Sequence, residues 1–293
     1  MIEKGGGLLN ILVFFFGASI GSFVNVVAYR LPRGMSIARP ASFCPHCRRP
    51  IPFWSNVPVL GYLMLRGRCL RCRDRIPARY FITEVALGVI ALILYANFTP
   101  LDALARLVLC AAMFAASWVD LDCRIIPDVI SLPGVLVGFA AASLLMPEIG
   151  WKDSLCGIAL GGGLLFVVGE LYQWLRGKEG MGMGDVKLLA MIGSFLGWEG
   201  MVFTLFFGSI LGAVGGIILG LLDWQPGSAE IMSGFANNGI AVAGEAPQPA
   251  AEDQEPASKE GLLQTPVPFG PFLSLAAGFF ALFQTQLVRW YFS

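Results

Sequence analysis

The chain has 293 residues, of which 56% are hydrophobic and only 14% are charged, and its mean hydropathy is +0.70. This composition excludes a soluble globular domain and predicts a polytopic membrane protein. The formal net charge is zero, but residues 30–79 contain eleven arginines, no lysine and Asp74 as the only acid. Because Lys and Arg gather in cytoplasmic loops, this segment is expected to face the cytoplasm.

Eight stretches of the sequence are candidates for membrane-spanning helices, which need roughly 20 mostly apolar residues. They cover residues 8–29, 80–97, 101–119, 126–146, 154–175, 185–198, 200–222 and 268–290. The sixth is short, so we expect it to begin slightly inside the membrane, with residues 180–184 as non-helical backbone. The predicted fold class is therefore an all-α polytopic membrane protein with about eight transmembrane helices.

The first apolar stretch has two interpretations. Lys4 precedes it and small residues lie within it, which is also typical of a secretory signal peptide. The much larger positive charge that follows favours a retained span with its N-terminus outside. If the N-terminus is outside and each span crosses the membrane in turn, the cytoplasmic side holds residues 30–79, 120–124, 176–187 and 223–267.

This count divides the chain into five parts. Residues 1–29 hold the first transmembrane helix, 30–79 a cytoplasmic basic module, 80–222 the membrane core and 268–293 the last transmembrane helix. Residues 223–267 are rich in Gly, Ala, Pro, Gln and Glu and poor in large apolar residues. Such a segment cannot offset the entropy of ordering, so it is predicted to be a disordered acidic linker.

Four of the seven cysteines form two C-x-x-C pairs within the basic module. They are Cys44, Cys47, Cys69 and Cys72. In a reducing compartment such pairs bind metal more often than they form disulfides, and this spacing is close to that of four-cysteine zinc sites. We expect a structural zinc ion there, with no open position for catalysis.

The only histidine, His46, lies between two of these cysteines and is expected to be a turn residue. This excludes serine-protease triads and H-E-x-x-H metalloprotease sites, because each needs a histidine as base or ligand in the right place. If the chain is a hydrolase, carboxylates must carry the proton transfers.

Asp185 follows alternating glycines at the start of an apolar stretch, where ionisable groups are costly and usually functional. The stretch 177–190, GKEGMGMGDVKLLA, resembles the G-x-G-D signature of intramembrane aspartyl proteases and, in its longer form, type IV prepilin peptidases. The glycines at Gly182 and Gly184 would allow close backbone approach to a substrate. Lys187 is expected to stabilise a carboxylate or to contact a lipid phosphate.

A second aspartate with the same resemblance is Asp120, in the stretch WVDLDCRIIPD at 118–128. The family's first catalytic aspartate sits in an I-D-x-x-x-x-x-I/L-P-D pattern, which points to Asp120. Two adjacent carboxylates share a proton, so one can activate water while the other hydrogen-bonds to the scissile carbonyl. Asp122 is a rival for this role, whereas Asp128 after Pro127 suits a helix start. The alternative is that these acids only cap helices or form ion pairs.

The family resemblance implies two activities. One is removal of the leader from type IV prepilins or type II secretion pseudopilins at the bacterial inner membrane. The other is methylation of the new N-terminus with S-adenosylmethionine. Arg79 and Glu84, at the cytoplasmic edge of the second span, are candidates for methyl transfer or substrate contact, with helix-end anchoring as the alternative. We expect the arginine-rich module to rest on anionic lipid.

Two other functions are compatible with intramembrane acids. A proton-coupled transporter could use Asp120 and Asp185 as a relay. A non-catalytic assembly factor could use the zinc module as a docking surface. Substitution of Asp120 or Asp185 tests the protease hypothesis against these two alternatives, because only the protease hypothesis predicts a loss of leader removal.

Overall fold

The computed structural model describes residues 6–176, 182–221 and 268–292. Over these residues the chain is helical, with no strand and only the isolated bridges Phe43 to Pro50 and Arg68 to Arg75. The elements are α1 (Gly7–Arg30), η1 (Phe53–Asn56), α2 (Leu60–Met64), α3 (Ala78–Asn97), α4 (Pro100–Cys123), α5 (Asp128–Leu144), α6 (Gly150–Arg176), α7 (Met183–Leu221) and α9 (Gly270–Phe292).

Six of the described helices are long and apolar enough to cross a membrane: α1, α3, α4, α6, α7 and α9. The shorter α5 is also apolar and contains Pro133. The all-helical membrane fold is therefore confirmed. The predicted linker at 223–267 lies outside the described residues.

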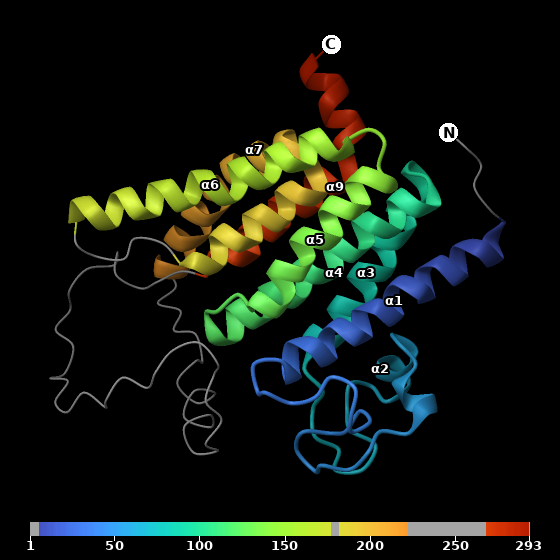
Figure 1. Cartoon of the computed structure of the whole chain (residues 1–293). Coiled ribbons are helices and arrows are strands. Elements are labelled where there is room, and N and C mark those ends of the chain that lie inside the picture. Colours follow the sequence, from blue (N-terminus) through green and yellow to red (C-terminus); the bar gives the residue numbers. More distant parts are fainter. Residues whose placement is uncertain (1–5, 177–181, 222–267, 293) are drawn as a thin grey trace, which may run out of the picture.

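Two predicted spans, 185–198 and 200–222, belong to one element, α7. Gly197 interrupts it with φ 71° and ψ −174°, a conformation that glycine adopts without a Cβ penalty. In Figure 1 the two halves of α7 run back alongside each other from this kink. The prediction that 180–184 is non-helical is wrong for Met183 and Gly184. Both lie in the first turn of α7, which is closed by the Asp185 N–H donating to the Gly182 carbonyl at 3.1 Å.

Small residues allow the helices to approach closely. Gly17 of α1 packs on the backbone of α3 at Leu87, and Gly157 of α6 packs on Gly193 of α7, so that an added Cβ would overlap the partner's backbone. In a bilayer, such small-residue contacts bring helices together in place of the hydrophobic effect.

The zinc module, residues 31–77, lies at one end of the helix bundle (Figure 1). The last turn of α1 and the first turn of α3 join it directly. The first turn of α1 and the last turns of α9 lie at the far end in the same view.

Candidate active site and candidate zinc site

The four cysteines of the zinc module form one cluster. Their Sγ atoms all lie within 4.8 Å of one another, and Cys44 Sγ is 3.8 Å from Cys72 Sγ. Tetrahedral Zn–S bonds of roughly 2.3 Å place sulfurs about 3.8 Å apart, so the donor set fits a zinc ion. Among the described residues this is the one such group, and Cys110, Cys123 and Cys156 are not part of it.

Two turns of the same design present these sulfurs. In the first, the Cys44 N–H donates to Arg49 and its carbonyl accepts from Arg48, which has φ 54°. In the second, Cys69 makes the same bonds with Asp74 and Arg73, which has φ 61°. Turns of this kind aim backbone N–H groups at sulfur: the N–H groups of Cys72 and Arg71 lower the pKa of Cys69, whereas burial raises the pKa of Cys44. A thiolate is the form that binds metal.

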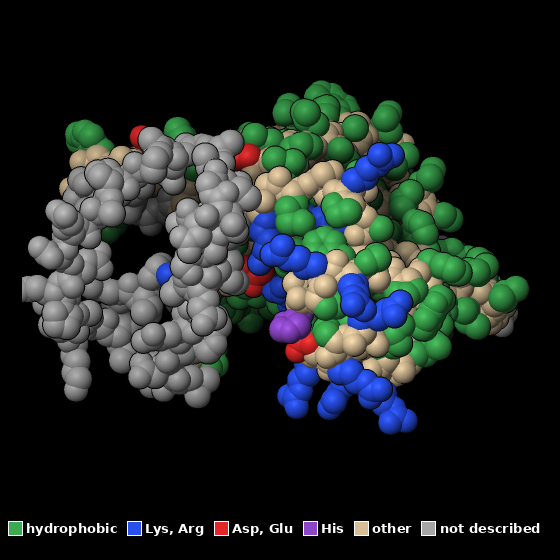
Figure 2. Space-filling model, turned by 90° about the horizontal axis from the view of Figure 1, so that it is seen from below, with side chains coloured by type: hydrophobic (Ala, Val, Ile, Leu, Met, Phe, Trp, Pro, Cys, Tyr) green, Lys and Arg blue, Asp and Glu red, His purple; other side chains and the backbone are tan. Residues whose placement is uncertain are grey.

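His46 does not contribute to the cluster. Its side chain is exposed, and its Nδ1 lies 3.7 Å from a carboxylate oxygen of Asp74. This agrees with the interpretation of His46 as a turn residue. Figure 2, which views the module from below, shows basic side chains spread over the same surface.

Asp120 lies in the last turn of α4 and is buried. Its Oδ2 accepts a hydrogen bond of 3.0 Å from the N–H of Gly270, the first residue of α9. The helix ends there because Arg124 adopts a left-handed conformation, with φ 55° and its N–H bonded to the Asp120 carbonyl. The carboxylate is thus held between the end of α4 and the start of α9.

Asp185 lies in the first turn of α7 and is close enough to Asp120 for their charges to interact. One residue brings the two helices together at this point. Ile126 packs against both glycines, since a Cβ added at Gly184 would lie 3.0 Å from the Ile126 Cβ and one at Gly270 would lie 3.3 Å from its Cδ1. The two predicted aspartates therefore lie near the same contact between Ile126, the start of α7 and the start of α9.

The neighbouring acids are already paired with cations. Asp122, the rival to Asp120, accepts two hydrogen bonds from Arg79 Nη1, at 2.8 and 3.0 Å. Asp128 accepts two from Lys187 Nζ, both at 2.7 Å, and is the first residue of α5. Within the described residues, no ion pair within 4.0 Å involves Asp120 or Asp185. Of the four acids Asp120, Asp122, Asp128 and Asp185, only Asp120 and Asp185 therefore have no cation bonded to the carboxylate.

The supporting residues of the glycine motif have structural partners. Gly184 permits the contact with Ile126, and Gly182 provides the carbonyl that closes the first turn of α7. Lys187 binds Asp128, which is the first of the two roles predicted for it.

Arg79 and Glu84 lie on different faces of the start of α3. Arg79 contacts α4 through Asp122 and stacks over Trp118 at 6.0 Å. Glu84 Oε2 accepts a hydrogen bond of 2.7 Å from the N–H of Val59, within the zinc module. The Glu84 contact joins the module to α3, and the Arg79 contact joins α3 to α4.

Gly270 and Ile126 were not predicted as site residues. Gly270 belongs to the turn Pro268-Phe269-Gly270-Pro271. Its position between a large residue and a proline is the only sequence feature that could have indicated a special role. Ile126 looks like any other apolar residue at a helix end. Their roles follow from contacts between segments that are far apart in the sequence.

Comparisons with known proteins agree with this geometry. Residues 15–98 match the model of the bacterial peptidase A24 N-terminal domain, and residues 107–217 match that of the type IV leader peptidase family. The first match covers the four cysteines and the second covers both aspartates.

Curated relatives extend the match to nearly the whole chain. A prepilin leader peptidase/N-methyltransferase of Aeromonas salmonicida is 31% identical over 308 residues, covering 96% of this chain and 93% of the relative. One of Pseudomonas putida is 36% identical over 235 residues, covering 71% and 80%. No solved structure gives a significant match. The chain belongs to the type IV leader peptidase family.

Proposed function

We propose that this chain removes the leader peptide from type IV prepilins or related pseudopilins with Asp120 and Asp185 as its catalytic pair, and that it methylates the new N-terminus. It is a multi-pass protein of the inner membrane. The relatives' names support both activities, and nothing in the comparisons supports the transporter alternative.

The observation that carries the proposal is the meeting of two carboxylates from different helices. Asp120 comes from the end of α4 and Asp185 from the start of α7, and their charges interact. The neighbouring acids Asp122 and Asp128 are neutralised by Arg79 and Lys187. Two close carboxylates in a half-buried corner favour a shared proton, which is the arrangement used by aspartic proteases.

Peptide hydrolysis by such a pair needs one carboxylate and one carboxylic acid. The ionised member removes a proton from water as the water oxygen attacks the scissile carbonyl carbon. The protonated member donates a hydrogen bond to the carbonyl oxygen, on which negative charge develops. Collapse of the tetrahedral intermediate breaks the C–N bond, and the leaving amine takes up a proton from the pair. The Gly270 N–H keeps the Asp120 carboxyl in place throughout.

The zinc module has a supporting role in this proposal. The four thiolates would hold zinc with every coordination position filled, which leaves none for a substrate or water. The ion would keep the two cysteine turns together, while Glu84 holds the module on α3 through Val59.

The arginine-rich face of the module is proposed to rest on anionic lipid at the cytoplasmic surface. Basic side chains near a membrane surface gain about 1 kcal/mol each from anionic lipid. Figure 2 shows such side chains spread over this face. In this orientation the N-terminus is outside and the aspartate pair is on the cytoplasmic side.

Methylation requires S-adenosylmethionine as the methyl donor. Arg79 and Glu84 are proposed to lie near the methyl-transfer or substrate region, because both are at the junction of the zinc module and the membrane helices. Arg79 bonds to Asp122, two residues after Asp120. The amine released by cleavage would therefore emerge beside this junction.

The decisive experiment incubates a purified prepilin with Asp120→Asn and Asp185→Asn variants in detergent. Each is expected to lower the cleavage rate by at least about 1,000-fold, as for loss of a general acid or base with its electrostatic partner. Asp153→Asn, at the start of α6, is the matched control and should cleave like the unchanged protein. Normal cleavage by either dyad variant would contradict the mechanism.

A further inference from the structure

We infer that a hydrated divalent cation, of the Mg²⁺ or Ca²⁺ class, binds in an acidic cavity at the end of the helix bundle opposite the zinc module. The turn between α5 and α6 meets the breaks in α7 and α9 at this cavity. The site is independent of the proposed peptidase and methyltransferase chemistry.

The cavity has a volume of about 320 Å³ and is lined by three separate parts of the chain. These are the α5–α6 turn with the start of α6, the break in α7, and the part of α9 that follows its own break. Figure 1 shows the α5–α6 turn and the last turns of α9 at the end of the bundle away from the zinc module. In the orientation proposed above, this end is on the outer side of the membrane.

The titratable side chains in the lining are all acidic. They are Glu148 in the α5–α6 turn, Asp153 in the first turn of α6 and Glu199 just after the break in α7. Within the described residues, none of the three forms an ion pair within 4.0 Å. Lys152, although next to Asp153, lies 5.7 Å from the centre of the Trp151 ring. The lining of the cavity therefore carries a negative charge that none of its own side chains balances.

A buried amide in the same wall is a second, separate sign of a ligand. Gln284, which is 7% exposed, lines the cavity from α9, and its Oε1 has no hydrogen-bond partner. A buried amide oxygen without a partner costs free energy. Because the last torsion of a glutamine side chain is soft, this oxygen can turn towards a cation in the cavity. Carboxylate and amide oxygens are the donors that Ca²⁺ and Mg²⁺ prefer.

Both long helices at the cavity are broken where they reach it. The break in α7 is at Gly197, with φ 71° and ψ −174°, and the break in α9 is at Phe283, with φ −119° and ψ 17°. The first half of α7 ends at Leu196, which also lines the cavity, so the negative end of its helix dipole lies there. Broken helices with such ends are typical of cation sites in membrane proteins.

Two of the acids also have an interpretation without a ligand. Asp153 and Glu199 each lie in the first turn of a helical segment, where an acid is stabilised by the helix dipole. This does not account for Gln284, which lies well inside α9, and Glu148 is outside both helices. The proposed ligands are therefore Glu148, Glu199 and Gln284, whereas Asp153 only adds negative charge.

The cation is expected to keep most of its water. The cysteine cluster is the only group of possible metal ligands among the described residues whose donor atoms all lie within 4.8 Å of one another, so the acids are too far apart to hold a bare ion. An ion with six waters occupies roughly 200 Å³, at about 30 Å³ per water. A cavity of about 320 Å³ accommodates it. Mg²⁺ commonly keeps several waters and contacts one or two carboxylates.

Buried hydrogen bonds order the surroundings of the cavity. The Ser154 hydroxyl donates to the Ser194 carbonyl at 2.7 Å and joins α6 to α7, and Arg106 Nη1 donates to the Ala281 carbonyl at 3.1 Å and joins α4 to α9. Arg106 is itself paired with Asp102 at 2.7 Å and does not line the cavity. These bonds exist before any ligand is bound, which lowers the entropic cost of binding.

A cation in this cavity would brace the two helices that begin near the proposed catalytic pair. Asp185 lies in the first turn of α7, and α9 begins at Gly270, which bonds to Asp120. At 1.5 Å per residue, each helix reaches the cavity roughly 20 Å further along. The cation would therefore fix the far ends of both helices without contacting the reacting groups.

The first test measures Mn²⁺ binding to the purified full-length protein by electron paramagnetic resonance, in buffer without chelator so that zinc stays in place. Mn²⁺ is paramagnetic and prefers the same oxygen donors as Mg²⁺. One Mn²⁺ site is expected, and Glu148→Gln is expected to weaken it at least fivefold. Glu170→Gln, on the exposed part of α6 and outside the cavity lining, removes the same charge and should bind normally. Equal affinity of the two variants, or no bound Mn²⁺, would overturn the inference.

The second test compares thermal melting in detergent with MgCl₂ and with KCl at equal ionic strength. A cation that binds the folded protein raises the melting temperature, so MgCl₂ should raise it by several degrees more than KCl. Gln284→Leu keeps the approximate size of the side chain but removes the amide oxygen, and it should abolish this Mg²⁺ increment. Its melting temperature in KCl should not fall, because Oε1 makes no hydrogen bond with the described residues.

The two variants together keep this second test decisive. Glu148 is exposed, so Glu148→Gln can be measured even where Gln284→Leu does not fold. An equal Mg²⁺ increment in the unchanged protein, Glu148→Gln and Gln284→Leu would overturn the inference. An equal effect of MgCl₂ and KCl on the unchanged protein would also overturn it, because charge screening alone would then explain the stabilisation.

Discussion

The N–H of Gly270 donates a hydrogen bond of 3.0 Å to Oδ2 of Asp120, although the two residues are 150 positions apart. This bond joins the first residue of α9 to the last turn of α4. It occupies one oxygen of the Asp120 carboxylate, whose charge interacts with that of Asp185. A glycine of α9 is therefore part of the proposed catalytic corner, although it has no side chain to titrate.

Substitution of Gly270 by alanine is expected to lower leader removal at least tenfold. A Cβ at this position would lie 2.7 Å from Asp120 Oδ2, closer than real Cβ atoms approach an oxygen, so the carboxylate or the start of α9 must move. A displacement of this size at a catalytic group costs substantially in rate. The measurement is the cleavage rate of a purified prepilin.

The control for this prediction lies on the same helix. A Cβ at Gly278 meets no atom within 4 Å, so Gly278→Ala should cleave prepilin at the normal rate. If both variants cleave normally, the Gly270 bond is unimportant for the position of Asp120.

Substitution of Asp122 by asparagine is expected to reduce thermal stability but to spare cleavage. It removes the charge that accepts two hydrogen bonds from the partly buried Arg79, and breaking such a pair costs about 1–3 kcal/mol. Melting of the purified variant in detergent measures the loss. Cleavage should stay within about threefold of normal, in contrast to Asp120→Asn. A loss of cleavage as large as that of Asp120→Asn would make Asp122 the catalytic residue instead.

Local sequence patterns were sufficient to predict some of these features. The four cysteines are spaced so that two short turns present them, and the turns need only nearby backbone contacts. The apolar stretches predicted the membrane helices, because a bilayer demands helices of a given length. Asp185 was predicted from a motif contained within a single helix start.

Contacts between helices could not be predicted in this way. The choice of Asp120 over Asp122 depends on which face of α4 meets α7 and α9, and hydropathy does not fix that rotation. In the structure, Asp122 accepts hydrogen bonds from Arg79, whereas Asp120 accepts one from the Gly270 N–H. Both bonds join segments distant in sequence, so their physical cause is tertiary packing.

Substitution of Lys187 by methionine is expected to have a small effect. Its partner Asp128 is more than half exposed, and exposed ion pairs contribute about 1 kcal/mol or less. Stability should fall by no more than this amount, and cleavage should stay within about threefold of normal. Prepilin cleavage and melting measured on one preparation test both statements. A loss of cleavage without a loss of stability would mean that Lys187 contacts the substrate.

Removal of zinc is expected to impair the module before it impairs the catalytic pair. Metal analysis should find about one zinc per chain, and Cys72→Ser should lower this content strongly, because three thiolates hold the ion less well than four. The metal-depleted protein should lose pilin methylation first, since Glu84, which is proposed to lie near the methyl-transfer region, is bonded to Val59 of the module. Cys156→Ser, in the exposed part of α6, is the control with normal zinc content.

The opposite order of losses is also informative. If metal-free protein cleaves and methylates at normal rates, the module does not need zinc. If it loses cleavage while methylation of a pre-cleaved pilin persists, the module supports the catalytic pair instead of the methyl-transfer region.

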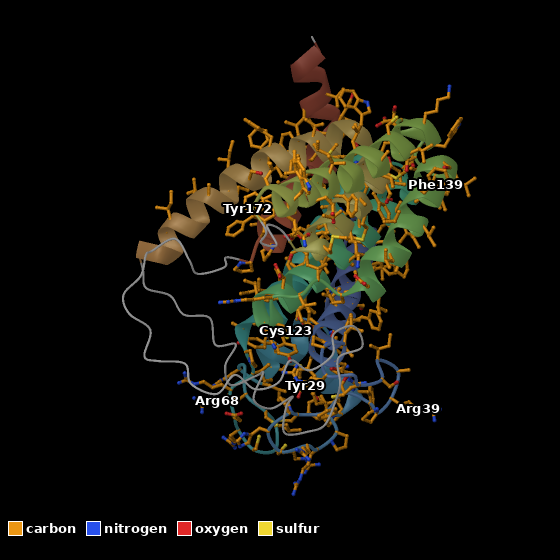
Figure 3. The ribbon with its side chains drawn as sticks, turned by 60° about the vertical axis from the view of Figure 1, so that its left-hand side comes forward. Tyr29, Arg39, Arg68, Cys123, Phe139 and Tyr172 are labelled. Carbon is orange, nitrogen blue, oxygen red and sulfur yellow. The ribbon has the colours of Figure 1, made fainter. Side chains whose placement is uncertain are left out.

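Labelling of single cysteines is expected to place the zinc module and the aspartate pair on the cytoplasmic side. Asn97 and Glu148 are exposed at the end of the bundle away from the module, whereas Arg39 and Arg68 are exposed on the module itself, as Figure 3 shows. A Cys156→Ser parent, which keeps the other six cysteines, sets the background signal, and an added cysteine at 97 or 148 should give new labelling with a membrane-impermeant thiol reagent in intact spheroplasts. Cysteines at 39 and 68 should react only after the membrane is opened. The reverse pattern would place the arginine-rich module outside, against the rule that basic loops remain in the cytoplasm, and would require the leader to be cut after export.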